Sequence, residues 1–207
     1  MRAYRRVRMG QVGVMTLAAV ASLSLVASLE MQSGDSGGSN PATERVKRGE
    51  YLVAVGGCND CHTPWKLGER GPEPDRTRLL SGHPADVILP PAPQAASEAW
   101  VMTMSATNTA FAGPWGVSFA TNLTPDAETG LGAWTEEIFI NALRTGKHWG
   151  QSRAILPPMP WPNYAQMTDE DLKSVFAYLR SIPARRNAVP EPIPPGGAAP
   201  PADGASE

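Results

Sequence analysis

The spacing of apolar residues predicts three helices, and the clearest lies near the C-terminal end of the sequence. Thr168 precedes a run of acidic residues, as an N-cap followed by an acidic first turn does, and Pro183 ends the pattern. Between them, apolar residues recur every three or four positions, which is the spacing of one buried helix face. These residues are Leu172, Val175, Phe176, Leu179 and Ile182.

Two further segments carry helical signals. The first runs from Thr43 to Gly57, with Thr43 as the expected N-cap and Glu44 in the first turn. The second begins at Thr135, continues through acidic and then apolar residues, and ends at Gly146. Glycine favours the left-handed conformation that commonly follows a helix. We expect the first and last of the three helices to cross.

The sequence between His62 and Trp134 reads mainly as loop, because proline and glycine recur and no helical spacing persists. Residues on either side of Gly113 and Pro114 predict one short two-stranded ribbon near residues 108–121. The predicted fold class is therefore all-α, with a long loop insertion between the first two long helices.

The two ends of the chain differ in composition from its middle. Residues 1–29 combine arginines with an apolar stretch, which is typical of a signal peptide. The stretch is also nearly long enough to span a membrane uncleaved, as a signal anchor does. Either one directs the rest of the chain to the periplasmic side of the cytoplasmic membrane. Residues 30–42 read as a flexible linker, residues 43–183 as one domain, and residues 184–207 as a disordered tail rich in Pro, Gly and Ala.

The two cysteines of the chain, Cys58 and Cys61, are followed directly by His62. This C-x-x-C-H pattern is typical of covalent haem attachment, with two thioethers from the cysteines and the histidine as the proximal iron ligand. A disulfide would close a very short loop, and a redox pair would need a βαβ setting. A zinc site would need further ligands, for which only His83 and His148 remain. Only haem attachment explains the histidine.

A methionine is the usual sixth ligand of an electron-transfer haem of this type. We predict Met159 as the distal ligand, because Pro158 and Pro160 restrict the backbone on both sides of it. His148 is the alternative ligand. Three other methionines after the motif are better explained by packing or exposure, namely Met102, Met104 and Met167.

Residues 47–183 resemble the class I c-type cytochromes. The runs RGEYLVAVGGCNDCHTP and DEDLKSVFAYLRSIP resemble the first helix with its attachment site and the last helix. The runs NLTPDAETGLG and PPMP narrow the resemblance to the cytochrome c subunits of membrane-bound alcohol, aldehyde and related dehydrogenases. The resemblance implies one covalently bound haem c, held by Cys58 and Cys61 and ligated by His62 and Met159.

The resemblance also implies a class I cytochrome c-like helical fold wrapped around the haem. Subunits of that kind usually contain three such modules, whereas this sequence has one C-x-x-C-H. The segment 68–105 is also longer than the corresponding segment of the usual module. Trp161 and Tyr164 either hydrogen-bond a haem propionate or serve as core aromatics. The run 122–132 either forms turns and caps or packs against the haem edge.

These features predict an electron-transfer protein, and not itself an enzyme, in a periplasmic or membrane-associated respiratory or dehydrogenase chain. Its expected partners are a dehydrogenase as donor and an oxidase or another cytochrome as acceptor. The formal net charge of −2 gives no electrostatic case for nucleic-acid binding. The alternative is a haem enzyme or sensor with a labile sixth ligand.

Overall fold

The computed structural model describes residues 40–92 and 101–197. The predicted signal segment 1–29 and most of the predicted linker lie outside these ranges. No helix of the described ranges is both long enough and apolar enough to cross a membrane. Helices and strands follow one another as α1 Pro41–Val55, α2 Cys58–His62, β1 Trp65–Gly68, β2 Gly71–Pro74, β3 Thr103–Met104, β4 Ala110–Gly113, β5 Gly116–Phe119, α3 Glu136–Thr145, α4 Trp161–Tyr164 and α5 Asp169–Ser181.

The ends of the helices follow from local capping. The predicted caps of the last two long helices are confirmed: the Thr168 hydroxyl accepts a bond from Asp171 N at 3.1 Å, and the Thr135 hydroxyl caps α3 in the same way. Gly146 ends α3 at φ 66°. The first helix, in contrast, begins earlier than predicted. Asn40 caps it, because the Asn40 side chain accepts from the backbone and proline at the next position suits the first turn.

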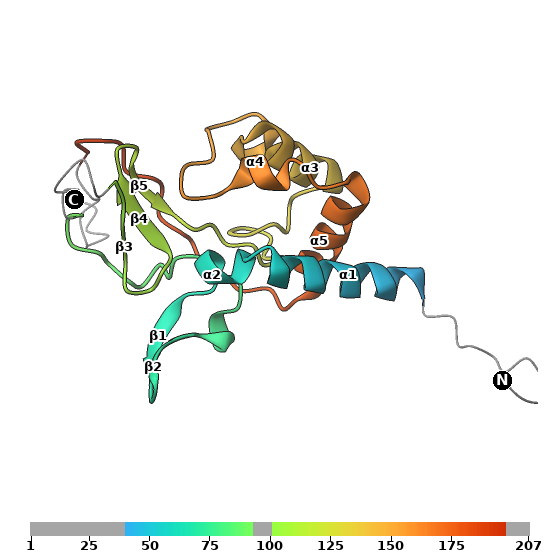
Figure 1. Ribbon diagram of the computed structural model, residues 1–207, viewed down its shortest axis with the longest axis horizontal. Coiled ribbons are helices and arrows are strands. Elements are labelled where there is room, and N and C mark those ends of the chain that lie inside the picture. Colours follow the sequence, from blue (N-terminus) through green and yellow to red (C-terminus); the bar gives the residue numbers. More distant parts are fainter. Residues whose placement is uncertain (1–39, 93–100, 198–207) are drawn as a thin grey trace, which may run out of the picture. The chain divides into compact units, whose positions relative to one another are not determined.

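Helices α1 and α5 cross closely, as the sequence predicts (Figure 1). Gly49 of α1 allows the two helices to approach this closely, because a Cβ at this position would lie 1.9 Å from the carbonyl oxygen of Ser174 in α5. The core forms where α1, α3 and α5 meet. Its buried side chains are Val53, Leu80, Leu131, Phe139, Leu143, Leu172, Val175, Phe176 and Leu179.

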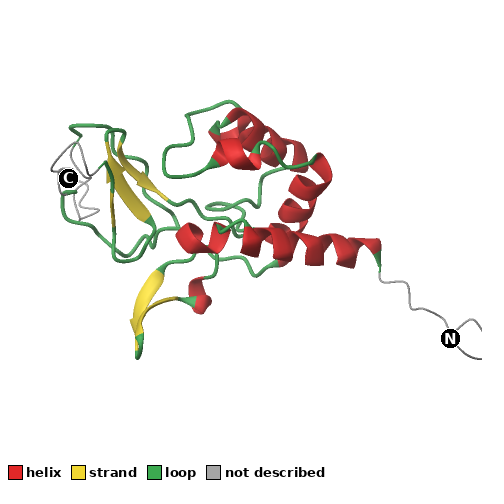
Figure 2. Ribbon diagram, in the orientation of Figure 1, coloured by secondary structure: helices red, strands yellow, loops and turns green. Residues whose placement is uncertain are grey.

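The prediction of an all-α fold is wrong. Two antiparallel sheets accompany the helices in the described ranges: β1 pairs with β2, and β3, β4 and β5 form a second sheet in that order (Figure 2). The ribbon expected near 108–121 corresponds to β4 and β5, which a third strand extends. The strands span only two to four residues each. Elements this short show almost no alternation of apolar and polar residues, so the sequence pattern does not reveal them.

The described chain also continues beyond the predicted domain end at residue 183. Residues 184–197, which the composition assigns to a disordered tail, run back along the domain and bond to it. The Arg185 carbonyl accepts from the side chain of Asn122 at 2.7 Å, and Arg185 N donates to the Thr124 hydroxyl at 3.0 Å. A segment of this composition cannot build a core of its own, but side chains of the body bind its backbone.

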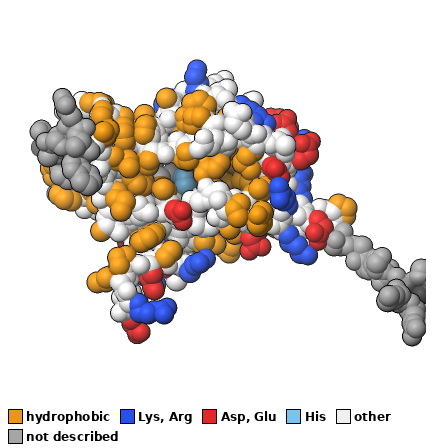
Figure 3. Space-filling view, viewed as in Figure 1, with side chains coloured by type: hydrophobic (Ala, Val, Ile, Leu, Met, Phe, Trp, Pro, Cys, Tyr) orange, Lys and Arg blue, Asp and Glu red, His pale blue; other side chains and the backbone are white. Residues whose placement is uncertain are grey.

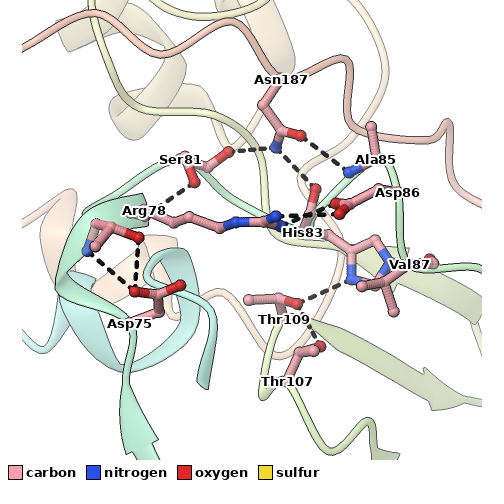
Figure 4. Close-up of polar contacts among 11 residues, drawn as sticks. Asp75, Arg78, Ser81, His83, Ala85, Asp86, Val87, Thr107, Thr109 and Asn187 are labelled. Atoms are coloured by element: carbon pink, nitrogen blue, oxygen red, sulfur yellow. Dashed lines mark hydrogen bonds and ion pairs between the residues drawn. The ribbon is translucent and has the colours of Figure 1, made fainter. Parts of the chain in front are cut away.

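His83 is fully buried beside the second sheet (Figure 4). Its Nε2 donates to the carbonyl of Val87 at 3.1 Å, and its Nδ1 accepts from the Thr109 hydroxyl at 2.9 Å. The nearby carboxylate of Asp86 is paired with Arg78 at 2.9 Å. The neutral ring is therefore satisfied at both nitrogens, and burial lowers the pKa of His83 below its ordinary value.

We expect acid to destabilise the protein more strongly when His83 is present than in a His83→Gln variant. Because the folded-state pKa of His83 is lowered, the unfolded chain takes up this proton first. The neutral His83 ring contributes fully to the stability of the fold at pH values above the pKa that this histidine has in the unfolded chain. That contribution is lost as the pH falls below this pKa. Denaturant unfolding at about pH 8 and about pH 5 measures the difference. An equal loss of stability in both proteins would contradict the expectation.

Candidate functional site

The C-x-x-C-H motif forms a short helix of its own. Gly57, at φ 71°, separates α1 from α2, and this left-handed conformation favours glycine. Residues three and four apart on a helix share one face, so Cys58, Cys61 and His62 point to the same side. His62 is buried and both cysteines are half-buried. All three line one cavity.

The cavity has a volume of about 460 Å³ and mainly apolar walls. Side chains from α1, α3 and α5 form part of it, together with the end of β5, residues 120–123 and 128–131, the loop 155–160 and the segment 188–192. Figure 3 shows a hollow on this face of the molecule, with a histidine inside and hydrophobic side chains around it. The cavity thus joins segments from nearly the whole described chain.

His62 is held in one tautomer. Its Nδ1 lies 2.8 Å from the carbonyl oxygen of Thr121, which only accepts, so Nδ1 carries the proton. Burial lowers the pKa of His62, which keeps the ring neutral and leaves the Nε2 lone pair free for a metal. Sequence reasoning missed Thr121, since its contribution is a backbone carbonyl that any residue type could supply.

The two thiols do not resemble a reactive pair. Both cysteines are free, and burial raises the pKa of Cys58 to about 11 and also raises that of Cys61. Cysteines that act as nucleophiles or redox centres have lowered values. No three His, Cys, Asp or Glu side chains gather to hold a metal ion in the part of the chain that the structure describes. Both described sheets are antiparallel, so the setting of a thioredoxin-like pair is absent there.

Met159 lies in the loop 155–160 and lines the cavity. The Ser118 hydroxyl of β5 donates to the carbonyl of Pro157 at 2.5 Å and so ties this loop to the second sheet. Met167 and His148 line the cavity as well. Met102 and Met104 do not belong to its lining and are 40% and 66% exposed, as expected for methionines without a role in the site.

The two aromatic candidates have partners of their own. Trp161 is not part of the lining and covers Gly146, where a Cβ would lie 2.3 Å from Trp161 Cε2. Tyr164 lines the cavity, yet its hydroxyl donates to the carbonyl of Gly56 at 2.5 Å and so connects α4 to the end of α1. A contact of either residue with a haem propionate stays a prediction.

The run 122–132 forms the turns expected of it and also lies at the cavity, while its packing against a haem edge stays a prediction. Asn122 Oδ1 accepts from Thr124 N at 3.0 Å, and Asp126 Oδ1 accepts from Thr129 N at 2.8 Å, so the side chains stabilise consecutive turns. Residues of the same run line the cavity. The turns therefore shape one wall of the site.

Several lining residues other than His148 carry no signal in the sequence. Trp134 and Trp149 stack with ring centroids 4.9 Å apart, and His148 lies against the Trp134 ring at 5.4 Å. Arg153 Nε pairs with Glu191 Oε2 at 3.5 Å, and both residues line the cavity. Arg153 and Glu191 are distant in sequence, so only the tertiary structure brings these two side chains together.

The known proteins similar to this chain include cytochrome c subunits of dehydrogenases. The gluconate 2-dehydrogenase cytochrome c subunit of Pantoea cypripedii is 31% identical over 134 residues, covering 65% of this chain and 22% of the relative. The alcohol dehydrogenase (quinone) cytochrome c subunit of Gluconobacter oxydans is 29% identical over 134 residues, covering 65% and 20%. A diheme cytochrome c-type of Cereibacter sphaeroides is 25% identical over 141 residues, covering 68% and 37%.

No protein-family model matches the chain. The chain spans 22% and 20% of the lengths of the gluconate and alcohol dehydrogenase subunits, so it corresponds to one portion of each. The resemblance predicted from the motifs is confirmed: the chain is similar to a cytochrome c module of the dehydrogenase cytochrome c subunits.

Proposed function

We propose that this chain is an electron-transfer protein that carries one haem c. Cys58 and Cys61 would form the thioethers, and His62 and Met159 would ligate the iron. The observation that carries the proposal is the cavity itself. It collects two thiols, a neutral imidazole and a thioether from opposite ends of the domain, within apolar walls.

The residues present fit a haem. His62 offers an unprotonated Nε2, because Nδ1 is used by the carbonyl of Thr121. The thioether of Met159 would serve as a soft ligand, which favours reduced iron and so would raise the potential of the haem. A bound haem supplies one-electron Fe(III)/Fe(II) chemistry. If His62 and Met159 both ligated the iron, the iron would have no open position for a substrate, which favours a carrier over an enzyme.

The relatives support a partner of the dehydrogenase kind. The names of two of them describe cytochrome c subunits of gluconate and alcohol dehydrogenases. A dehydrogenase subunit would donate electrons to this chain, and an oxidase or another cytochrome would accept them through a small, transient contact. The apolar stretch and arginines of residues 1–29 favour the periplasmic side of the cytoplasmic membrane, either soluble or anchored.

The purified oxidised protein tests the proposal. We expect a mass increase equal to one haem under denaturing conditions, because one C-x-x-C-H is present. We also expect the weak near-infrared absorption of a methionine bound to ferric haem. An unchanged mass would refute haem attachment, and a gain of two haems would refute the single site. A high-spin oxidised spectrum would favour the enzyme or sensor with a labile sixth ligand.

A further inference from the structure

One wall of the cavity comes from beyond the last helix. Five consecutive residues line it there, namely Ala188, Val189, Pro190, Glu191 and Pro192. The two prolines have no N–H group, so this stretch turns fewer unpaired donors toward an apolar space than an ordinary loop would. We call residues 187–193 the C-terminal strap.

Asn187 fixes the beginning of the strap (Figure 4). Its Nδ2 donates to the carbonyl oxygens of Ser81 at 2.7 Å and His83 at 2.8 Å, and its Oδ1 accepts from Ala85 N at 2.9 Å. Its own backbone N–H donates to the Thr129 hydroxyl at 2.9 Å. The side chain therefore holds the strap to the loop 81–85, while the backbone holds it to the cavity wall.

Strand β5 fixes the end of the strap. Val117 N donates to Ile193 O at 2.8 Å, and Ile193 N donates back to Val117 O at 2.9 Å. Gly116 allows this approach, because a Cβ there would lie 2.0 Å from Ile193 O. The backbone of the strap thus occupies the space that any larger residue at this position would need.

An ion pair joins the strap to the body between these two anchors. Arg153 and Glu191 are 3.5 Å apart, but their side chains are 37% and 86% exposed. Ion pairs this exposed contribute little to stability. The hydrogen bonds of Asn187 and Ile193 therefore hold the strap in place, and a Glu191→Gln change is expected to leave it closed.

We propose that the C-terminal strap is part of the haem-binding site and closes it against water and small ligands. The inference rests on the proposed function, since it concerns access to the haem. A strap fixed at both ends, with its central residues in the cavity wall, separates the iron from solvent without supplying a ligand. Burial of this kind also raises the potential of a haem, because water stabilises the more highly charged oxidised form.

The test measures how fast imidazole binds to the oxidised protein. Gly116→Ala and Asn187→Ala each disrupt one anchor, and a chain that ends at Arg186 lacks the strap altogether. We expect imidazole to bind about tenfold faster or more in all three, because several hydrogen bonds that keep the strap closed are lost. The reduction potential should fall in the same proteins, and amide exchange at Ile193 should accelerate in the two substituted ones.

Gly71→Ala is the matched control. Gly71 also has a positive φ, 115°, and begins β2 directly after the hairpin turn, but a Cβ at this position would meet no atom beyond its chain neighbours within 4 Å. It should bind imidazole at the wild-type rate. If haem is attached and all three strap variants bind imidazole at that rate with unchanged potential, the strap is not part of the site. If the wild-type protein carries no haem, the proposed function itself fails, and the strap proposal with it.

Discussion

A Cys58→Ala, Cys61→Ala double variant is expected to carry no covalently attached haem. Both thiols line the cavity beside His62, and each thioether requires its own sulfur. Removing both leaves His62 as the only one of the three motif side chains that could hold the haem. Haem staining after denaturing electrophoresis and the mass of the unfolded chain measure the effect, which should be a complete loss of attached haem.

The same variant should also be less stable than the wild-type holoprotein. A cavity of about 460 Å³ would lose the group that the proposal assigns to it, and unfilled apolar cavities destabilise a fold. Thermal unfolding monitored by circular dichroism gives the comparison. Met104→Ala, at an exposed position outside the cavity, is the control and should keep its haem. Attached haem in the double variant would refute the role of these two cysteines.

Met159→Ala is expected to keep its attached haem but to lose the near-infrared band of methionine ligation. Loss of the thioether should lower the reduction potential by on the order of hundreds of millivolts, because axial ligands are a major determinant of haem potential. Absorption spectroscopy of the oxidised protein and a redox titration measure the two effects. Small ligands should then bind the vacated axial position.

Two other side chains of the cavity make this experiment decisive. Met167 and His148 also line it, so Met167→Ala and His148→Ala serve as matched variants. If the band survives in Met159→Ala and vanishes in Met167→Ala, then Met167 is the ligand. If the band is absent from the wild-type protein and the oxidised spectrum changes in His148→Ala, a histidine occupies the sixth position instead.

The sequence by itself predicted the features that depend on neighbouring residues. Thr135, Gly146 and Thr168 cap helices through bonds that span three or four residues, so their residue types suffice to predict them. The apolar spacing of α5 indicated its buried face for the same reason. The attachment motif is equally local, because Cys58 and His62 must lie within a turn of each other.

Other features depended on contacts between distant segments, and only the tertiary structure decided them. The strands are too short to leave an alternating pattern, and the all-α expectation failed there. Thr121 acts through its carbonyl oxygen, which no residue type reveals. The strap is the clearest example. Its proline-rich composition predicts no core of its own, yet Asn187 and Val117 bind its two ends. Amino-acid composition indicates whether a segment can form a hydrophobic core of its own. It does not indicate whether the rest of the domain binds that segment as part of a cavity wall.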